Sequence, residues 1–292
     1  MGYGQLAAVL ALVVLAAAGC GSADPPPPGA AAVQLTVTRN FGNEHLVSAR
    51  AAPGQSAMFA LRRNADVGGA YAGKFVASIN GVKGNTGNGW DWFYFVNGIQ
   101  ANVGAAAYTL HKGDREWWDY RYWTVYQEVP VVIGAWPDPF VHGWEGAQPS
   151  VHVGGLGCAQ TLASALKRDG AHLTNGQADS TVTVMTFAEA ANGPISGAQA
   201  QSRGLTVWLE HGGVMIYRNS TAIADPTAQA LIAAYRPDGA GQNSATLVVA
   251  GRTEAAACAA ARTLANRPAA VRSAYAVALD GDGRVTARGG AS

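Results

Sequence analysis

The sequence predicts an α+β protein in which a small β module is followed by an α/β layered domain. Strand patterns at Lys74–Asn80 and Trp90–Val96 place residues of opposite parity on opposite sides of a sheet. The pairs Asn80-Gly81 and Asn97-Gly98 favour tight turns at the ends of these strands, because both residue types tolerate positive φ angles. From Glu128 onward, strands alternate with helices, which indicates a layered domain with a partly parallel sheet.

The first twenty residues have the pattern of an export signal. Leu6–Gly19 is an apolar run that is too short to span a bilayer but is typical of the central part of a signal peptide. Small residues then lead to Cys20, and this junction resembles a bacterial lipoprotein signal, in which the cysteine is lipidated. We therefore expect an extracytoplasmic protein that a lipid on Cys20 anchors to the cell membrane. The alternative is an ordinary cleaved signal in which Cys20 is incidental.

Composition indicates how the rest of the chain is divided. After the signal (residues 1–20), residues 21–32 are proline-rich and predict an extended tether. The remaining length suits two domains, which we place at residues 33–127 and 128–292. The net charge of +1, from 20 basic and 19 acidic residues, provides no broad basic field, so we expect no nucleic-acid partner.

Two cysteines remain once Cys20 is assigned to the lipid. Cys158 and Cys258 each lie near the start of a predicted helix, and an oxidising compartment permits a disulfide between them. The alternative is two buried free thiols that act as small apolar side chains, and the sequence leaves both possibilities open. A metal site needs more ligands than this pair offers, so none is expected.

The second domain is predicted element by element. Strands are expected at Val129–Trp136, Val151–Val153, Thr181–Phe187, Leu205–Glu210, Val214–Arg218, Ala245–Ala250, Ala274–Leu279 and Arg284–Ala287. Helices are expected at Cys158–Lys167, Thr227–Tyr235 and Glu254–Leu264. Gly154–Gly157 favours a sharp strand-to-helix turn over a phosphate-binding loop, because the glycine spacing is incomplete. The common hydrolase and nucleotide-hydrolase motifs do not occur in the sequence, so we expect no enzymatic activity.

Aromatic residues are concentrated in the first domain. Seven of the eight tryptophans fall within 55 residues: Trp90, Trp92, Trp117, Trp118, Trp123, Trp136 and Trp144. Strand alternation puts Trp90, Trp92 and Tyr94 on one face and prevents the adjacent Trp117 and Trp118 from sharing a face. Rigid aromatic faces bind flat or apolar ligands and sugars. The alternative is that many of these side chains belong to the core.

The same region resembles a known domain family. The resemblance rests on four phrases in order: SING from Ser78, W-x-W-F-Y-F-V-N-G from Trp90, V-G-A-x-x-Y-x-L-x-x-G-D from Val103, and W-x-Y from Trp118. These phrases, together with Gly73, resemble the transcobalamin C-terminal-like family (DUF4430), whose relatives include cobalamin carriers. The resemblance covers roughly residues 33–126. The resemblance implies a small grasp-like fold in which one helix crosses a sheet. In the carriers, the corresponding domain contacts one face of the corrinoid.

The resemblance and the aromatic residues together predict a binding function. We expect an exported, lipid-anchored protein that binds a bulky planar small molecule, cobalamin-like in the first instance, and passes it to a membrane importer. The cobalamin would be a ligand, and no cofactor is expected. The expected ligand-binding residues are Asn80, Gly81, Trp90, Trp92, Tyr94, Asn97, Gly98, Val103 and Tyr108. The alternatives are a structural or protein-interaction module at the cell envelope and an enzyme that acts on envelope glycans with a carboxylate pair.

Overall fold

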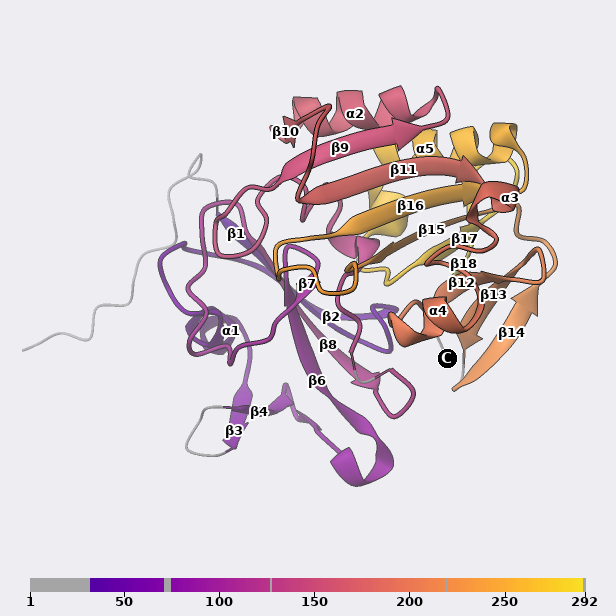
Figure 1. Cartoon of the computed structure of the whole chain (residues 1–292). Coiled ribbons are helices and arrows are strands. Elements are labelled where there is room, and N and C mark those ends of the chain that lie inside the picture. Colours follow the sequence, from indigo (N-terminus) through magenta and orange to yellow (C-terminus); the bar gives the residue numbers. More distant parts are fainter. Residues whose placement is uncertain (1–31, 71–74, 127, 219, 291–292) are drawn as a thin grey trace, which may run out of the picture.

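The computed structural model describes residues 32–70, 75–126, 128–218 and 220–290 (Figure 1). The predicted signal, the lipidation site at Cys20, nearly all of the tether, and Gly73 lie outside these residues. The described part combines helices and strands in several sheets, which confirms the predicted α+β class. Within it, the helices are too short or too polar for one to cross a membrane.

The N-terminal half is built on a five-stranded mixed sheet. Its strands lie in the spatial order β2 (Glu44–Ala51), β1 (Val33–Arg39), β8 (Arg115–Tyr122), β6 (Trp90–Val96) and β7 (Ile99–Gln100). Helix α1 (Ala57–Asn64) is capped at its N-terminus by Ser56, whose hydroxyl accepts the Phe59 N–H. Its buried residues join the apolar face formed by β1 and β6 in one core cluster. One helix on a sheet is the arrangement that the family resemblance implies.

A small sheet extends from this half (Figure 1). It contains β3 (Val67–Ala70), β4 (Phe75–Ile79) and β5 (Val82–Lys83), followed by the 3₁₀ turn η1 (Thr86–Asn88). The two predicted Asn-Gly turns are present, with φ of 47° and 79° at Asn80 and Gly81 and of 52° and 76° at Asn97 and Gly98. Strand β6 has the bounds that the alternating pattern predicted.

The C-terminal half contains a seven-stranded sheet. Its spatial order is β10 (His172–Leu173), β9 (Ser150–Gly155), β11 (Ser180–Thr186), β16 (Thr246–Gly251), β15 (Ala230–Tyr235), β17 (Val277–Leu279) and β18 (Val285–Arg288). The first four strands are parallel and the others antiparallel, so the predicted partly parallel sheet is confirmed. Helices α2 (Ala159–Arg168) and α5 (Glu254–Asn266) cover one face, and a disulfide joins Cys158 to Cys258 between them.

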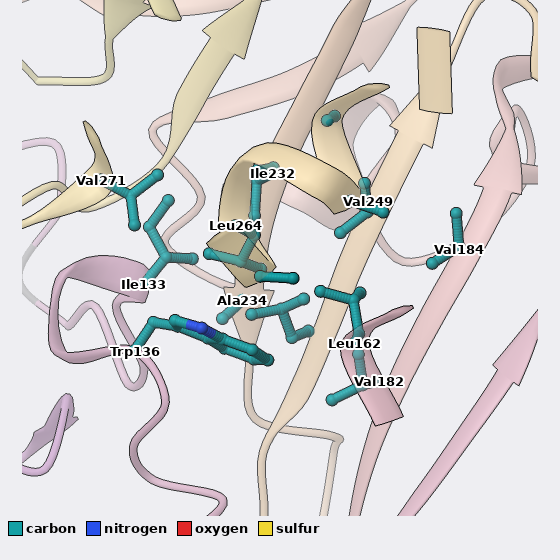
Figure 2. Packing of buried hydrophobic residues seen from close by; sticks show 14 of the residues in the cluster. Ile133, Trp136, Leu162, Val182, Val184, Ile232, Ala234, Val249, Leu264 and Val271 are labelled. Atoms are coloured by element: carbon teal, nitrogen blue, oxygen red, sulfur yellow. The ribbon is translucent and has the colours of Figure 1, made fainter. Parts of the chain in front are cut away.

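Both faces of this sheet are buried. Figure 2 shows Leu162 and Leu264 of the helices packed with Val182, Val249 and Ile232 of the sheet. The other face is covered by a three-stranded sheet and two short helices. The sheet contains β12 (Val207–Glu210), β13 (Gly213–Arg218) and β14 (Thr221–Asp225), and the helices are α3 (Phe187–Ala190) and α4 (Gly197–Ser202).

Two predicted elements were wrong. The expected helix Thr227–Tyr235 is strand β15, whose six residues are all buried. A continuous apolar run has the same pattern in a helix and in a strand buried on both faces, so periodicity did not separate the two. The expected strand Val129–Trp136 is an irregular connection with a 3₁₀ turn, η2 (Ile133–Ala135). Its backbone bonds to both halves, because Val132 N–H donates to Gly98 and Ile133 N–H to Tyr275.

The second face of the N-terminal sheet packs on the C-terminal half. Phe95 of β6 and Trp117 of β8 stack at 5.2 Å, and both contact the ring of Tyr275 edge-on. Trp118 faces the opposite way, into the core beside α1. The prediction that Trp117 and Trp118 lie on different faces is thus confirmed, and one core cluster contains residues of both halves.

Candidate functional site

A groove of about 680 Å³ opens on the N-terminal half, between the β4–β5 hairpin, strand β6 and the segment that follows β7. The groove is lined by Met58, Phe75, Val76, Ala77, Gly84, Thr86, Asp91, Trp92, Phe93, Tyr94, Gln100, Ala101, Asn102, Val103, Gly104, Ala105 and Trp118. We refer to this set of residues as the aromatic groove. Its volume lies within the range of small-molecule sites, about 300 to 1,000 Å³.

Two aromatic side chains of β6 hold the walls of the aromatic groove together. Trp92 Nε1 donates to the carbonyl of Val82, 3.0 Å away, and so ties the β4–β5 hairpin to the strand. Tyr94 donates its hydroxyl to the carbonyl of Val103 at 2.6 Å, which fixes the opposite wall. Burial raises the pKa of Tyr94 well above its usual range, so this hydroxyl stays a donor. The groove is therefore formed before any ligand arrives.

The aromatic floor continues into the neighbouring strand. Tyr94 stacks on Trp118 of β8, with ring centroids 4.8 Å apart and planes 21° apart. Gly84 allows the hairpin to approach β6 closely, because a Cβ there would lie 2.7 Å from the carboxylate of Asp91. The floor is thus a rigid aromatic surface that spans two paired strands.

The rim of the aromatic groove combines apolar and polar groups. Phe75 and Val103 are 59% and 38% exposed, so both present apolar surface at the rim. Asp91 and Asn102, which also line the groove, are polar. This arrangement suits a ligand with one flat apolar face and a polar edge.

The structure brings three of the predicted ligand-binding residues together in the aromatic groove: Trp92, Tyr94 and Val103. Trp90 lies outside it, stacked on Tyr120 over a separate shallow hollow. Asn80 and Gly81 form the exposed β4–β5 turn, where Asn80 Oδ1 accepts the N–H of Asp66.

Three other predicted residues lie away from the groove. Tyr108 is buried, packs on Trp144 at 4.6 Å and accepts the N–H of Glu145. Asn97 and Gly98 lie at the junction between the halves. A Cβ on Gly98 would lie 2.8 Å from the carbonyl of Val132, so the glycine permits the two segments to meet.

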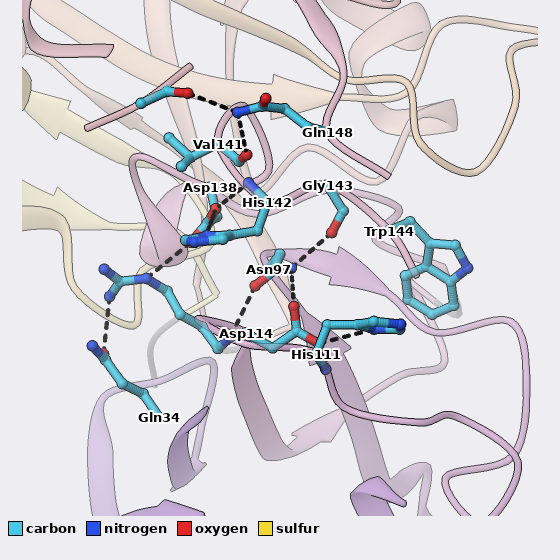
Figure 3. A network of polar contacts seen from close by, with 12 residues as sticks. Gln34, Asn97, His111, Asp114, Asp138, Val141, His142, Gly143, Trp144 and Gln148 are labelled. Carbon is cyan, nitrogen blue, oxygen red and sulfur yellow. Dashed lines mark hydrogen bonds and ion pairs between the residues drawn. The ribbon is translucent and has the colours of Figure 1, made fainter. Parts of the chain in front are cut away.

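Asn97 is fully buried and forms three hydrogen bonds through its side chain (Figure 3). Its Nδ2 donates to Asp114 at 2.8 Å and to the carbonyl of Gly143 at 2.7 Å, and its Oδ1 accepts the N–H of Arg115 at 2.8 Å. The amide thus joins β6, β8 and the connection between the halves, and its role is structural.

Several groove residues were not among those expected from the sequence. Phe75 lies in the predicted strand Lys74–Asn80, but the alternating pattern does not specify that its side chain is exposed. Met58 comes from α1, and its place in the groove depends on how the helix packs. No local pattern contains that information.

Strand β8 also contains buried carboxylates on both faces. Burial raises the pKa of Glu116 to about 8, and its Oε1 accepts the Trp118 indole N–H at 2.6 Å. On the other face, burial raises the pKa of Asp119 to about 6. Among the described residues, there is no group of three or more histidines, cysteines and carboxylates arranged to hold a metal ion.

Comparisons with known proteins match only part of the chain. No curated protein matches the sequence. One similar solved structure is that of a suspected metal-binding protein from Ruminococcus gnavus ATCC 29149. The two sequences are 15% identical and the TM-score is 0.26. The match covers 31% of this chain and 96% of that protein's chain. Residues 54–122 match the model of DUF4430, a domain of unknown function, and every residue of the aromatic groove lies between these limits. Residues 54–122 are therefore a domain of the DUF4430 family.

Proposed function

We propose that this protein binds a bulky small molecule with a flat apolar face in the aromatic groove, and does not catalyse a reaction. The main support is that Trp92 and Tyr94 use their own polar atoms to hold both walls of the groove. A preformed site loses little conformational entropy on binding. The exposed Phe75 and Val103 at the rim give an apolar ligand an immediate contact surface.

The ligand class we propose is a cobalamin-like corrinoid. The groove is open on one side, so it suits one face of a macrocycle better than a small enclosed molecule. Asn102 is exposed and lines the groove, so the polar side groups of a corrinoid would reach it. The proposal also includes export, a lipid anchor on Cys20 and transfer of the ligand to a membrane importer, which the sequence pattern supports.

The test is a titration of the purified full chain with cobalamin and with cobinamide. Calorimetry measures binding, and tryptophan quenching is corrected for absorption by the corrin. We expect saturable binding of micromolar or tighter affinity, and Phe75→Ala should weaken it about tenfold, because one large apolar contact is lost. Phe59→Ala is the matched control, since Phe59 is 49% exposed but does not line the groove.

The alternative is a protein-interaction module at the envelope. The observation that favours it is the exposure of Phe75 and Val103, since exposed apolar residues also mark contact sites for proteins. If neither corrinoid produces heat or quenching beyond absorption, the ligand proposal is contradicted and this alternative takes its place. Equal affinities of the Phe75→Ala and Phe59→Ala variants would contradict the assignment of the groove.

The anchor is tested separately. We expect Cys20→Ala to release the protein from the membrane fraction and to abolish incorporation of a labelled fatty acid. Unchanged membrane association and labelling would contradict lipidation at this residue.

A further inference from the structure

Two adjoining hollows lie along the junction between the halves, with volumes of about 490 and 370 Å³. Both are lined by Arg115, Gly134 and Arg272, and we call the two hollows together the junction cleft. Gln34 of β1 and Arg50 of β2 line it on the N-terminal side, whereas Arg272 follows η3 (Pro268–Val271) on the C-terminal side. The junction cleft exists only where the two halves meet.

The ionisable side chains of the junction cleft are mainly basic: Arg50, Arg115, Arg272, His45 and His142. Three carboxyl groups also line it. Asp138 is fully buried, and its charge is offset by its partners. Burial raises the pKa of Glu116 to about 8, so this carboxyl is largely uncharged at neutral pH. Asp169 is exposed, which leaves one accessible carboxylate beside three guanidinium groups.

The buried carboxylate of Asp138 orients two of the basic side chains (Figure 3). Its Oδ2 accepts the Nε–H of Arg115 at 3.0 Å, and its Oδ1 lies 2.9 Å from Nδ1 of His142. Oδ1 also accepts the backbone N–H of His142 at 3.0 Å. The hydrogen bond to Asp138 raises the pKa of His142, which favours its charged form. A buried acid that fixes an arginine and a histidine produces a preorganised positive surface.

Part of this surface has no partner among the residues that the structure describes. Nη1 of Arg115 donates to Gln34 Oε1 at 3.1 Å, whereas its Nη2 has no hydrogen bond to any described residue. The guanidinium groups of Arg50 and Arg272 likewise have no hydrogen-bond partner in the described part of the chain. Gly113 makes room for the imidazole, because a Cβ there would lie 2.4 Å from His142 Nε2. The donors that remain can bind an anion.

We propose that the junction cleft binds an oxyanion, a phosphate or carboxylate group of a small molecule, between Arg115 and Arg272. Planar guanidinium groups match such anions with paired hydrogen bonds. The site contains Arg115 from the N-terminal half and Arg272 from the C-terminal half, so both halves contribute to binding. It is separate from the aromatic groove and does not depend on what binds there.

The test uses calorimetry on the purified full chain in a low-salt Tris chloride buffer, with inorganic phosphate in one arm and tricarballylate in the other. We expect saturable binding of at least one anion, and the tighter arm identifies the oxyanion. Arg272→Ala should weaken binding about tenfold, because charge-assisted hydrogen bonds are lost. Arg262→Ala on α5 removes the same charge from an exposed position outside the junction cleft and should leave the affinity unchanged.

Three results would overturn the proposal. The first is that neither anion binds saturably to the unaltered protein. The second is that Arg272→Ala binds as tightly as the unaltered protein while its melting temperature is unchanged. The third is that Arg262→Ala weakens binding as much as Arg272→Ala, which would indicate general attraction to a positive surface.

Discussion

Tyr275 of the C-terminal half donates its hydroxyl to the carboxylate of Asp119 on β8, with 3.0 Å between the oxygens. Both side chains are buried, and Asp119 also accepts the hydroxyl of Thr38 and the N–H of Gly42. Residues 156 positions apart in the chain therefore complete one hydrogen-bonded cluster at the junction. The two halves are joined by specific polar contacts as well as by aromatic packing.

Removing the Tyr275 hydroxyl should lower the stability of the folded protein. We expect Tyr275→Phe to lower the free energy of unfolding by about 1 to 3 kcal/mol, because a buried carboxylate loses a donor. The measurement is urea unfolding followed by tryptophan fluorescence. Tyr122→Phe is the control, since Tyr122 is partly exposed and its hydroxyl has no hydrogen bond among the described residues. A loss of the same size in both variants would contradict a special role for Tyr275.

Glu116 should make stability depend on pH. Burial raises its pKa in the folded protein to about 8 from the ordinary value of 4.5, so its contribution to stability is full below pH 4.5 and is lost as the pH rises toward 8. We expect the free energy of unfolding of the unaltered protein to fall relative to that of Glu116→Gln across this range, by at most about 1.4 kcal/mol per pH unit. Denaturant unfolding at several pH values between 5 and 8 measures the difference. Parallel curves for the two proteins would refute the raised pKa.

Asn97 should matter for stability and not for binding in the aromatic groove. We expect Asn97→Ala to lower the free energy of unfolding by about 2 to 4 kcal/mol, because Asp114 and the Gly143 carbonyl lose a buried donor. Thermal melting and corrinoid titration measure the two properties separately. Asn88→Ala, at an exposed position, should change neither. If the Asn97→Ala protein melts normally but binds the corrinoid more weakly, this prediction is contradicted and Asn97 is a ligand-binding residue.

The disulfide should stabilise the C-terminal half. Cys158 and Cys258 are 100 positions apart, and closing a loop of this length restricts the unfolded chain. We expect the double variant Cys158→Ser, Cys258→Ser to lose roughly 2 to 5 kcal/mol of unfolding free energy. The same loss should follow when the unaltered protein is unfolded in the presence of a reducing agent. Equal stability with and without reductant would contradict this prediction.

Local patterns predicted most of the secondary structure but failed where burial decided the outcome. Strand β6 and its Asn-Gly turn follow from alternation and from residues that accept positive φ angles. Strand β15 did not follow, because an alanine-rich apolar run is compatible with a helix until strands on both sides bury it. The irregular segment around Ile133 depends on two distant partners, which no local pattern specifies.

The candidate site shows the same division. The sequence placed Trp92 and Tyr94 on one face of a strand, which the structure confirms, but it grouped Asn97 with them because Asn97 directly follows the same strand. Asn97 instead belongs to the junction, since Gly143 and Asp114 surround it after folding. The aromatic groove and the junction cleft also depend on segments that lie far apart in the chain.

By itself, the sequence determined the α+β class, the alternation of faces in β6, the Asn-Gly turns and the alternating elements of the second half. These features depend on backbone preferences and on the spacing of apolar residues over a few positions. Tertiary structure alone decided which aromatic side chains line a groove, whether the two cysteines pair, and that Arg115 and Arg272 share a cleft. Burial and long-range hydrogen bonding set these outcomes, and both arise only when distant segments pack together.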